Sequence, residues 1–240
     1  MICKVYGCDS SSNLTSSCDF LPVTMFYYFL LLIAVFDVYW IIRLAFTKLI
    51  YPFLSPIHIT EGAGHLYSLC WTTDIDIFLH MNNGKYFKEM DFGRFDFYFR
   101  SGLTDYIQSR PSWYVVQHAA SIKYRRPINF LVPFKLVTKL RYWDDRSLYF
   151  EQKFVSLHDG FVRAIATSKN TVVGGNVVEM MRSLGADEPP ECPQDIQLWQ
   201  ESQEIVSNGL RPADMKPKID EHLRRNEESN PCHKDTFKTI

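Results

Sequence analysis

Five polar residues that could act on a carbonyl group lie within ten positions of one another. They are Asp74, Asp76, His80, Asn82 and Asn83. The two asparagines are followed by glycine, a sequence typical of a turn that starts a helix. A carboxylate beside a helix start can hold a water molecule, while free backbone amides there polarise a carbonyl oxygen. One or two of these side chains would be enough to cap a helix. Because five are present, the stretch also predicts a site that attacks a carbonyl group.

A long aromatic helix is predicted directly after this stretch. Tyr86, Met90, Gly93 and Phe97 recur at helical spacing and so predict one buried face. Gly93 stands among bulky residues, which predicts a close approach to another backbone, most simply that of a sheet. Gly102 can supply the left-handed residue that ends the helix.

Five strand-like stretches flank the helix in the sequence. One precedes it at residues 66–72, and four follow it at residues 113–124, 134–143, 148–157 and 161–173. Tight-turn sequences at residues 144–147 and 158–160 predict that the last three strands are antiparallel neighbours. The pattern predicts an α+β fold in which an antiparallel sheet holds one long helix.

The polar stretch and two later segments resemble a known family. Asp76-x-x-x-His80-Met-Asn-Asn-x-x-Tyr86 is similar to the loop and helix start of hot-dog-fold acyl thioesterases. The Trp-Asp-Asp-Arg turn at residues 143–146 and the segment at residues 154–161 further resemble the thioesterase superfamily member six proteins. The resemblance runs from about residue 33 to residue 199. It implies a curved antiparallel sheet wrapped around a central helix, and homodimers that bind an acyl thioester between subunits.

The resemblance also implies roles for individual residues. Asp76 would be the general base that activates water, or the nucleophile that attacks the thioester. The backbone amide of Asn83 would polarise the thioester oxygen, while His80 and Asn82 would orient the loop and hydrogen-bond the base. The resemblance implies no metal and no other cofactor.

Arg125 and Arg126 lie at the end of a predicted strand. Exposed, solvated charge is the simpler interpretation, because isolated surface arginines are ordinary. The alternative is contact with the phosphates of coenzyme A, for which the guanidinium group is geometrically suited.

Two functions remain open. The first is hydrolysis of fatty acyl-CoA, with acyl-carrier protein as a less favoured substrate. The second is a weak or inactive hot-dog domain that binds acyl-CoA or protein partners at a membrane. Leu79 stands where the family has glycine, and Phe78 stands where plant acyl-carrier thioesterases have asparagine. A bulkier loop, without the glycine that lets the backbone approach the thioester, favours the second function.

Residues 20–46 predict a membrane anchor. No charged residue occurs from residue 20 to residue 36, and the apolar run continues to about residue 42, long enough to cross the hydrocarbon core. No small-x-small cleavage site follows, so an uncleaved signal-anchor is favoured over a cleaved signal peptide and secretion. Arg43 and Lys48 after the run predict a cytosolic globular domain, on the endoplasmic reticulum membrane. Met25 is an alternative start to Met1.

The rest of the chain completes the predicted organisation. We expect a polar tail at residues 1–19, the anchor at 20–46, a linker at 47–64, the hot-dog domain at 65–175, an extension with a short helix at 176–209 and a disordered tail at 210–240. The net charge of −1 gives no reason to expect nucleic acid as a partner. The seven histidines and six cysteines show no metal-ligand spacing.

Overall fold

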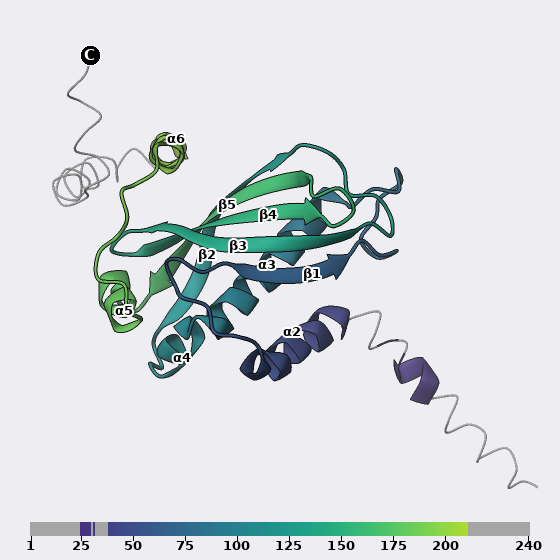
Figure 1. Ribbon diagram of the computed structural model, residues 1–240, viewed down its shortest axis with the longest axis horizontal. Helices are drawn as coiled ribbons and strands as arrows, with labels where there is room; N and C mark the ends of the chain where they lie inside the picture. The colour runs from purple at the N-terminus through teal and green to yellow at the C-terminus, as the bar shows by residue number, and fades with distance from the viewer. Residues whose placement is uncertain (1–24, 30, 32–37, 211–240) are drawn as a thin grey trace, which may run out of the picture. The chain divides into compact units, whose positions relative to one another are not determined.

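The computed structural model describes residues 25–29, 31 and 38–210 (Figure 1). The chain divides into two units, residues 1–49 and 50–240. The first unit contains nearly all of helix α2 (Val38–Ile50). The predicted tail at 1–19, nearly all of the tail at 210–240 and much of the predicted anchor lie outside the described residues.

Among the residues that the structure describes, no helix is both long enough and apolar enough to cross a membrane.

Five antiparallel strands form one sheet in the second unit. They are β1 (Gly64–Leu69), β2 (Tyr114–Tyr124), β3 (Pro133–Trp143), β4 (Ser147–Ser156) and β5 (Val162–Val173). Their order across the sheet is β1-β3-β4-β5-β2, so β1 and β2 are the edges. The last three strands in the sequence are antiparallel neighbours, as their tight turns predicted. Strand β1 begins and ends earlier than predicted, and the other four strands start or end within one residue of the predicted limits.

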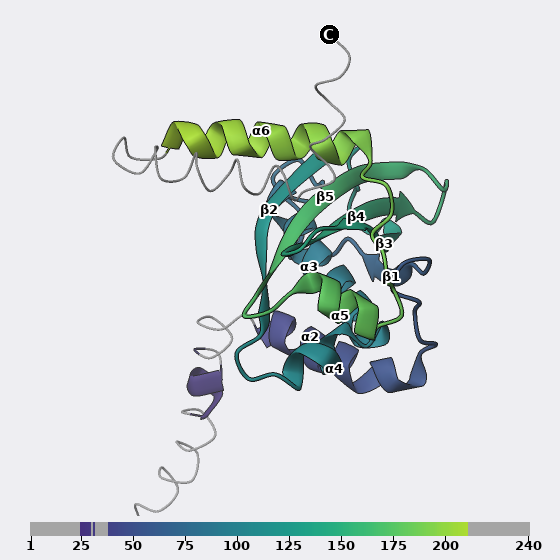
Figure 2. The ribbon, with the colours of Figure 1, turned by 90° about the vertical axis from the view of Figure 1, so that its left-hand side faces the viewer.

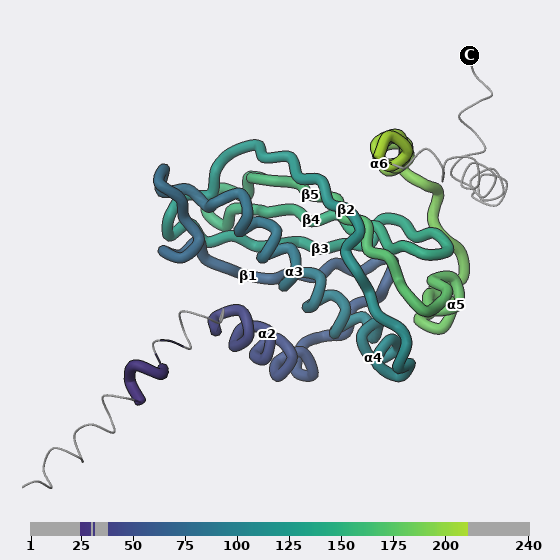
Figure 3. Tube along the Cα trace, turned by 180° about the vertical axis from the view of Figure 1, so that it is seen from behind, coloured from purple at the N-terminus to yellow at the C-terminus, as the bar shows by residue number. Residues whose placement is uncertain are grey.

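Helix α3 (Asn83–Arg100) lies across one face of this sheet (Figures 1 and 3). It begins after Asn82, whose Oδ1 accepts a hydrogen bond from the Gly84 N–H at 2.9 Å. It ends before Gly102, which has the predicted left-handed conformation with φ +77°. A long helix wrapped by an antiparallel sheet is the α+β arrangement that the hot-dog resemblance implied.

Gly93 sets how closely α3 approaches the sheet. A Cβ atom at this position would lie 2.6 Å from Leu136 Cδ2, 2.7 Å from Thr138 Oγ1 and 2.9 Å from Gln152 Nε2. The close approach predicted for Gly93 is therefore present, although its neighbours are side chains of the sheet and not another backbone. With any larger residue, either these side chains or the helix itself would have to shift.

Hydrogen bonds beneath the middle of α3 fix its position along the sheet. Arg94 Nη1 donates to Gln152 Oε1 at 3.2 Å, and Gln152 Nε2 donates to Met90 O at 2.9 Å and to Thr138 Oγ1 at 3.1 Å. On either side of these bonds lie two apolar clusters, one around Tyr86 and one around Phe97. Because buried polar groups need specific partners, this network holds the start of α3 in one place.

Four short or peripheral helices complete the second unit. The 3₁₀-helix η1 (Tyr51–Phe53) lies within the predicted linker, and α4 (Leu103–Gln108) and α5 (Val177–Ser183) cover one end of the core (Figure 2). Helix α6 (Gln194–Leu210) lies almost wholly within the extension at residues 176–209, for which a short helix was predicted. Its Ile196 packs on Tyr142 and Tyr149 at the face of the sheet away from α3 (Figure 2).

Candidate functional site

The loop before α3 is a tight turn that its own backbone closes. The Asp76 N–H donates to His80 O at 2.9 Å, and the Leu79 N–H donates to Asp76 O at 3.0 Å. Asp76 Oδ1 accepts a further hydrogen bond from the Phe78 N–H at 2.9 Å. Leu79 has φ +59°, a conformation that glycine adopts freely. The turn therefore has a backbone suited to the glycine of the family pattern, although leucine occupies the position.

Asp74 ties this turn to the rest of the domain. Its buried carboxylate accepts a hydrogen bond from the Trp71 N–H at 2.9 Å and lies 3.5 Å from Lys85 Nζ. Its backbone carbonyl accepts the Asn82 N–H at 2.8 Å. Asp74 is thus engaged in holding the start of α3, and it does not line the cleft described next.

A cleft of about 260 Å³ opens between the turn, the start of α3 and the end of β2. Five of the six residues predicted for the site line it: Asp76, His80, Asn83, Arg125 and Arg126. The sixth, Asn82, does not line the cleft, and its Oδ1 caps α3. The structure brings these residues together, and their catalytic roles stay predictions.

The positive end of α3 borders this cleft. Asn83 is the first residue of the helix, so its N–H belongs to the turn that makes no intrahelical hydrogen bond. Backbone dipoles add partial positive charge at the same end. This is the local chemistry needed to stabilise negative charge on a carbonyl oxygen.

Two tyrosines for which the sequence suggested no role in the site also line the cleft. The Tyr124 hydroxyl donates to Asn83 O at 3.3 Å, and its ring meets that of Tyr86 edge to face at 5.0 Å. Burial raises the pKa of Tyr86 to about 12 and that of Tyr124 above its ordinary value. Both phenols therefore stay protonated at neutral pH and can donate hydrogen bonds. The position of Tyr124 directly before the two arginines could have identified it.

Arg125 and Arg126 form the basic side of the cleft. Their guanidinium groups lie over the ring of Phe161, at 4.7 and 4.2 Å from its centroid. Neighbouring Arg163 pairs with Asp159 at 2.7 Å. In the described part of the chain, Arg125 and Arg126 have no such carboxylate partner, so their charge is available to an anion.

The thiol of Cys70 is not activated. Cys70 is fully buried, and this burial, with smaller effects from Asp74 and Glu89, raises its pKa to about 11. A thiol that stays protonated at neutral pH is a poor nucleophile. Among the described residues, no group of three or more His, Cys, Asp or Glu side chains could hold a metal ion.

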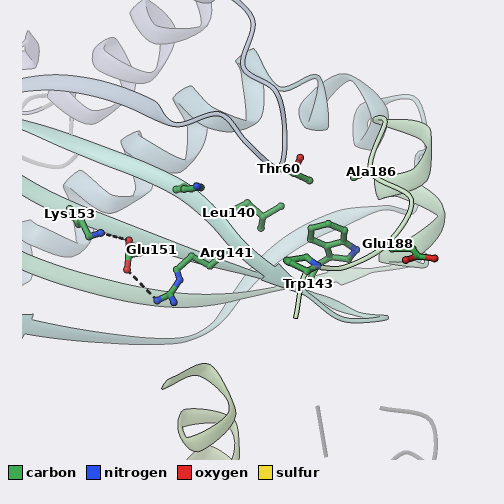
Figure 4. Close-up of a pocket in the computed structure, with 10 residues that line it drawn as sticks. Thr60, Leu140, Arg141, Trp143, Glu151, Lys153, Ala186 and Glu188 are labelled. Carbon is green, nitrogen blue, oxygen red and sulfur yellow. Dashed lines mark hydrogen bonds and ion pairs between the residues drawn. The ribbon is translucent and has the colours of Figure 1, made fainter. Parts of the chain in front are cut away.

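A larger groove of about 660 Å³ lies along the part of β3 that β1 does not cover (Figure 4). Its charged side chains largely neutralise one another, because Glu151 contacts both Arg141 at 3.3 Å and Lys153 at 2.6 Å. None of the predicted site residues lines it. We therefore place the candidate site in the smaller cleft, where a carboxylate, a helix start and two arginines meet.

Known proteins resemble this chain both in sequence and in structure. Protein THEM6 of Drosophila melanogaster is 40% identical over 184 residues, which cover 76% of this chain and 95% of that protein. Protein THEM6 of Danio rerio is 34% identical over 185 residues, covering 76% of this chain and 91% of that protein. The probable thioesterase YbaW from Escherichia coli has a TM-score of 0.48 and 17% identity, covering 52% of this chain and 97% of that one.

The sequence profile of the thioesterase-like superfamily matches residues 70–200, which include the turn, the cleft and the whole of α3. This match extends over more than half of the chain, and the identity to the two THEM6 proteins extends over three quarters of it. The chain therefore belongs to the thioesterase-like superfamily and, within it, to the family of the THEM6 proteins.

Proposed function

We propose that the domain hydrolyses fatty acyl-CoA thioesters in the cleft at the start of α3. The observation that carries this proposal is that three kinds of group line one cleft: the Asp76 carboxylate, the amide end of α3 at Asn83, and the guanidinium groups of Arg125 and Arg126. These groups suit, in that order, the activation of water, the polarisation of a thioester oxygen and the binding of coenzyme A phosphates.

The chemistry follows from how Asp76 is held. Because the Phe78 N–H engages Oδ1, Oδ2 is the oxygen that takes a proton from water. The water oxygen then attacks the thioester carbonyl carbon, and negative charge develops on the carbonyl oxygen beside Asn83. When the C–S bond breaks, the coenzyme A sulfur leaves and takes up the proton, and the fatty acid is released.

The direct test is hydrolysis of a panel of acyl-CoA thioesters of increasing chain length by the purified full chain. Asp76→Asn is the test variant, and Asp74→Asn is the matched control two positions away. The proposal requires turnover by the wild type and by Asp74→Asn, and its loss in Asp76→Asn. Equal turnover by the wild type and Asp76→Asn would remove the assignment of hydrolysis to this cleft.

Binding without turnover is the second candidate function. The observation that favours it is the chemistry of the turn that carries Asp76, where Ile77, Phe78 and Leu79 are all large, apolar and exposed. Such side chains suit an acyl chain or an apolar partner, and they contribute nothing to proton transfer. Saturable binding of acyl-CoA by a wild type that shows no hydrolysis would select this function.

We further propose that two copies pair through β2. This strand pairs only with β5, so its other edge has no strand partner in the described chain. Tyr114 and Val116 on this strand are 55% and 45% exposed. An open edge of eleven residues invites pairing with another strand. The resemblance adds that an acyl thioester would then lie between the copies.

Residues 20–46 are proposed to anchor the chain in the endoplasmic reticulum membrane, with the globular domain in the cytosol. The support is the uncharged run in the sequence, followed by Arg43 and Lys48. Extraction of cell membranes with alkaline carbonate should leave the full chain in the pellet. Recovery of the mature protein from the medium without residues 20–46 would instead favour signal cleavage and secretion.

A further inference from the structure

Two leucines beside the cleft adopt a backbone conformation that leucine rarely takes. Leu79 has φ +59° and Leu131 has φ +58°, and no other non-glycine residue in the described part of the chain has a positive φ. This region is strained for residues that carry a Cβ atom. The two side chains are 62% and 48% exposed, so packing inside the domain does not compensate for the strain. A role outside the domain would explain why leucine and not glycine occupies both positions.

The two leucines belong to one continuous surface, here called the apolar rim. It consists of Trp71, Ile77, Phe78, Leu79, Phe130 and Leu131, which are between 37% and 89% exposed. Backbone hydrogen bonds join its three segments, from the Phe130 N–H to Leu79 O at 3.1 Å and from the Leu131 N–H to Cys70 O at 2.8 Å. Ile77, at 89%, is the most exposed member, so the rim ends in a protruding apolar tip.

Positive charge lies next to the apolar rim. Arg125 and Arg126 line the same cleft as Asp76 and His80. Asp76 and His80 directly flank the rim residues 77–79 in the sequence. Apolar and aromatic tips flanked by basic side chains suit the surface of a bilayer that contains anionic lipids. A second copy of the chain, docked rim to rim about a twofold axis, would bring four arginines of like charge together, which disfavours that occupant.

We propose that the apolar rim inserts into the surface of an anionic phospholipid bilayer, so that the cleft opens at the boundary between membrane and water. The strained leucines supply apolar side chains at the two turns where glycine would leave none. The inference rests on the proposed function only in one respect, that the acyl chain reaches the cleft from the bilayer. Contact with lipid itself requires no turnover.

Photocrosslinking tests this contact in the full chain. A photoreactive benzoylphenylalanine replaces Phe78, and the protein is reconstituted in phosphatidylcholine vesicles with about 30% phosphatidylserine. The matched control carries the same group at Leu198, a residue of α6 that is 56% exposed and lies on neither the rim nor β2. We expect several-fold more phospholipid adduct at position 78 than at position 198, and less adduct without phosphatidylserine. Equal lipid adducts at the two positions, or adducts at 78 mainly with a second copy, would overturn the inference.

Leu79→Gly, made in the chain that carries the photoreactive group at 78, separates a lipid-binding role from a structural one. Glycine keeps the left-handed turn and removes the apolar side chain, so Tm should hold or rise while the yield of lipid adduct falls. A lower Tm would show that Leu79 stabilises the fold, and would contradict the inference. Lipid adducts without hydrolysis would overturn the proposed function alone, whereas hydrolysis without preferential adducts would overturn this inference alone.

Discussion

Asp74 and Asp76 are two positions apart, yet the structure gives them different tasks. Asp74 is buried against Lys85 and the Trp71 N–H, while Asp76 faces the cleft. Asp76→Asn should lower kcat by about a hundredfold or more, the scale for loss of a positioned base. Asp74→Asn should leave kcat nearly unchanged and lower the free energy of unfolding by about 1 kcal/mol, because one partly buried ion pair is lost.

Steady-state hydrolysis and denaturant unfolding of the same preparations measure the two effects.

His80→Ala is the useful third variant. The structure shows that Asp76 is held by the backbone carbonyl of His80, which alanine retains. Loss of the imidazole should therefore reduce kcat less than Asp76→Asn does. A larger fall in kcat for Asp74→Asn than for Asp76→Asn would show that Asp74, and not Asp76, is the base.

Leu79→Gly should stabilise the protein by about 0.5–1 kcal/mol. The left-handed conformation costs leucine roughly 1–2 kcal/mol, and the entropy that glycine loses on folding offsets part of that gain. Leu157→Gly is the matched control, since Leu157 is 44% exposed but has no positive φ. It should lower the free energy of unfolding by roughly 0.5–1 kcal/mol. Urea unfolding of both variants tests whether the free energy of unfolding rises for Leu79→Gly and falls for Leu157→Gly. A fall for both variants would show that Leu79 is not strained.

At this scale the sequence predicted what is local. Asp76, His80 and Asn83 lie within one turn and one helix start, so their spacing alone brings them together. Tyr124 is forty-one positions from Asn83, and only the pairing of β2 with β5 brings its hydroxyl to that residue. No local pattern predicts such a contact. The left-handed φ at Leu79 could be anticipated only through the glycine of the family pattern.

Among the elements, the packing of α3 on the sheet depends most on Gly93. Gly93→Ala should lower the free energy of unfolding by about 1–2 kcal/mol. The new methyl group would stand 2.6–2.9 Å from atoms of Leu136, Thr138 and Gln152, and this overpacking costs roughly 1–3 kcal/mol. The better helix propensity of alanine returns at most about 1 kcal/mol.

Gly209→Ala in α6 is the control, because nothing lies within 4 Å of a Cβ atom there. It should leave the free energy of unfolding unchanged or slightly higher. Thermal unfolding of the two variants and the wild type separates the effect of helix propensity from the effect of packing between α3 and the sheet. An equal rise in Tm for both would mean that the sheet leaves room beneath α3.

Long periodic elements were predictable, and short ones were not. Helix α3 and the strands carry enough repeats of their hydrophobic pattern to be recognised. Helices α4 and α5 have six and seven residues, fewer than two full turns, so their periodicity is invisible. Their end signals were present: Gly102 both follows α3 and precedes α4, and Asn176 Oδ1 accepts hydrogen bonds from the Val178 and Glu179 N–H groups.

For the whole molecule, buried phenols predict that stability falls at alkaline pH. Burial raises the pKa of Tyr86 and of Tyr142 to about 12, and raises those of Tyr98 and Tyr149 as well. A pKa that is higher in the folded than in the unfolded state gives stability that is complete below the unfolded pKa and is lost as pH rises through the folded one. We therefore expect the free energy of unfolding to fall between about pH 10 and pH 12.

For Tyr86 alone, the rise in pKa to about 12 corresponds to a loss of a few kcal/mol once the pH has passed that value. Urea unfolding over this pH range, with phenolate absorbance as a second signal, measures the fall. Tyr86→Phe should have a shallower decline than the wild type, because one buried phenol no longer resists ionisation. Identical slopes for the two proteins would show that Tyr86 does not contribute to the alkaline limit.

Assembly is the remaining property of the whole molecule that the open edge of β2 predicts. The full chain in detergent should sediment as a dimer at micromolar concentration. Val116→Lys should weaken that dimer at least tenfold, about 1.4 kcal/mol, because lysines on two paired edges repel each other and edge lysines disfavour strand pairing. Leu198→Lys, at a residue of α6 that is 56% exposed, should leave the dimer intact.

The same pair of variants tells whether the cleft is complete within one copy. Tyr124, Arg125 and Arg126 line the cleft at the end of β2, so pairing along that strand would place the partner's chain beside it. If the partner helps to bind the thioester, Val116→Lys should raise KM at low protein concentration and recover as the concentration rises. Leu198→Lys should show no such dependence. A monomeric Val116→Lys with wild-type kcat/KM would establish that each copy binds and acts alone.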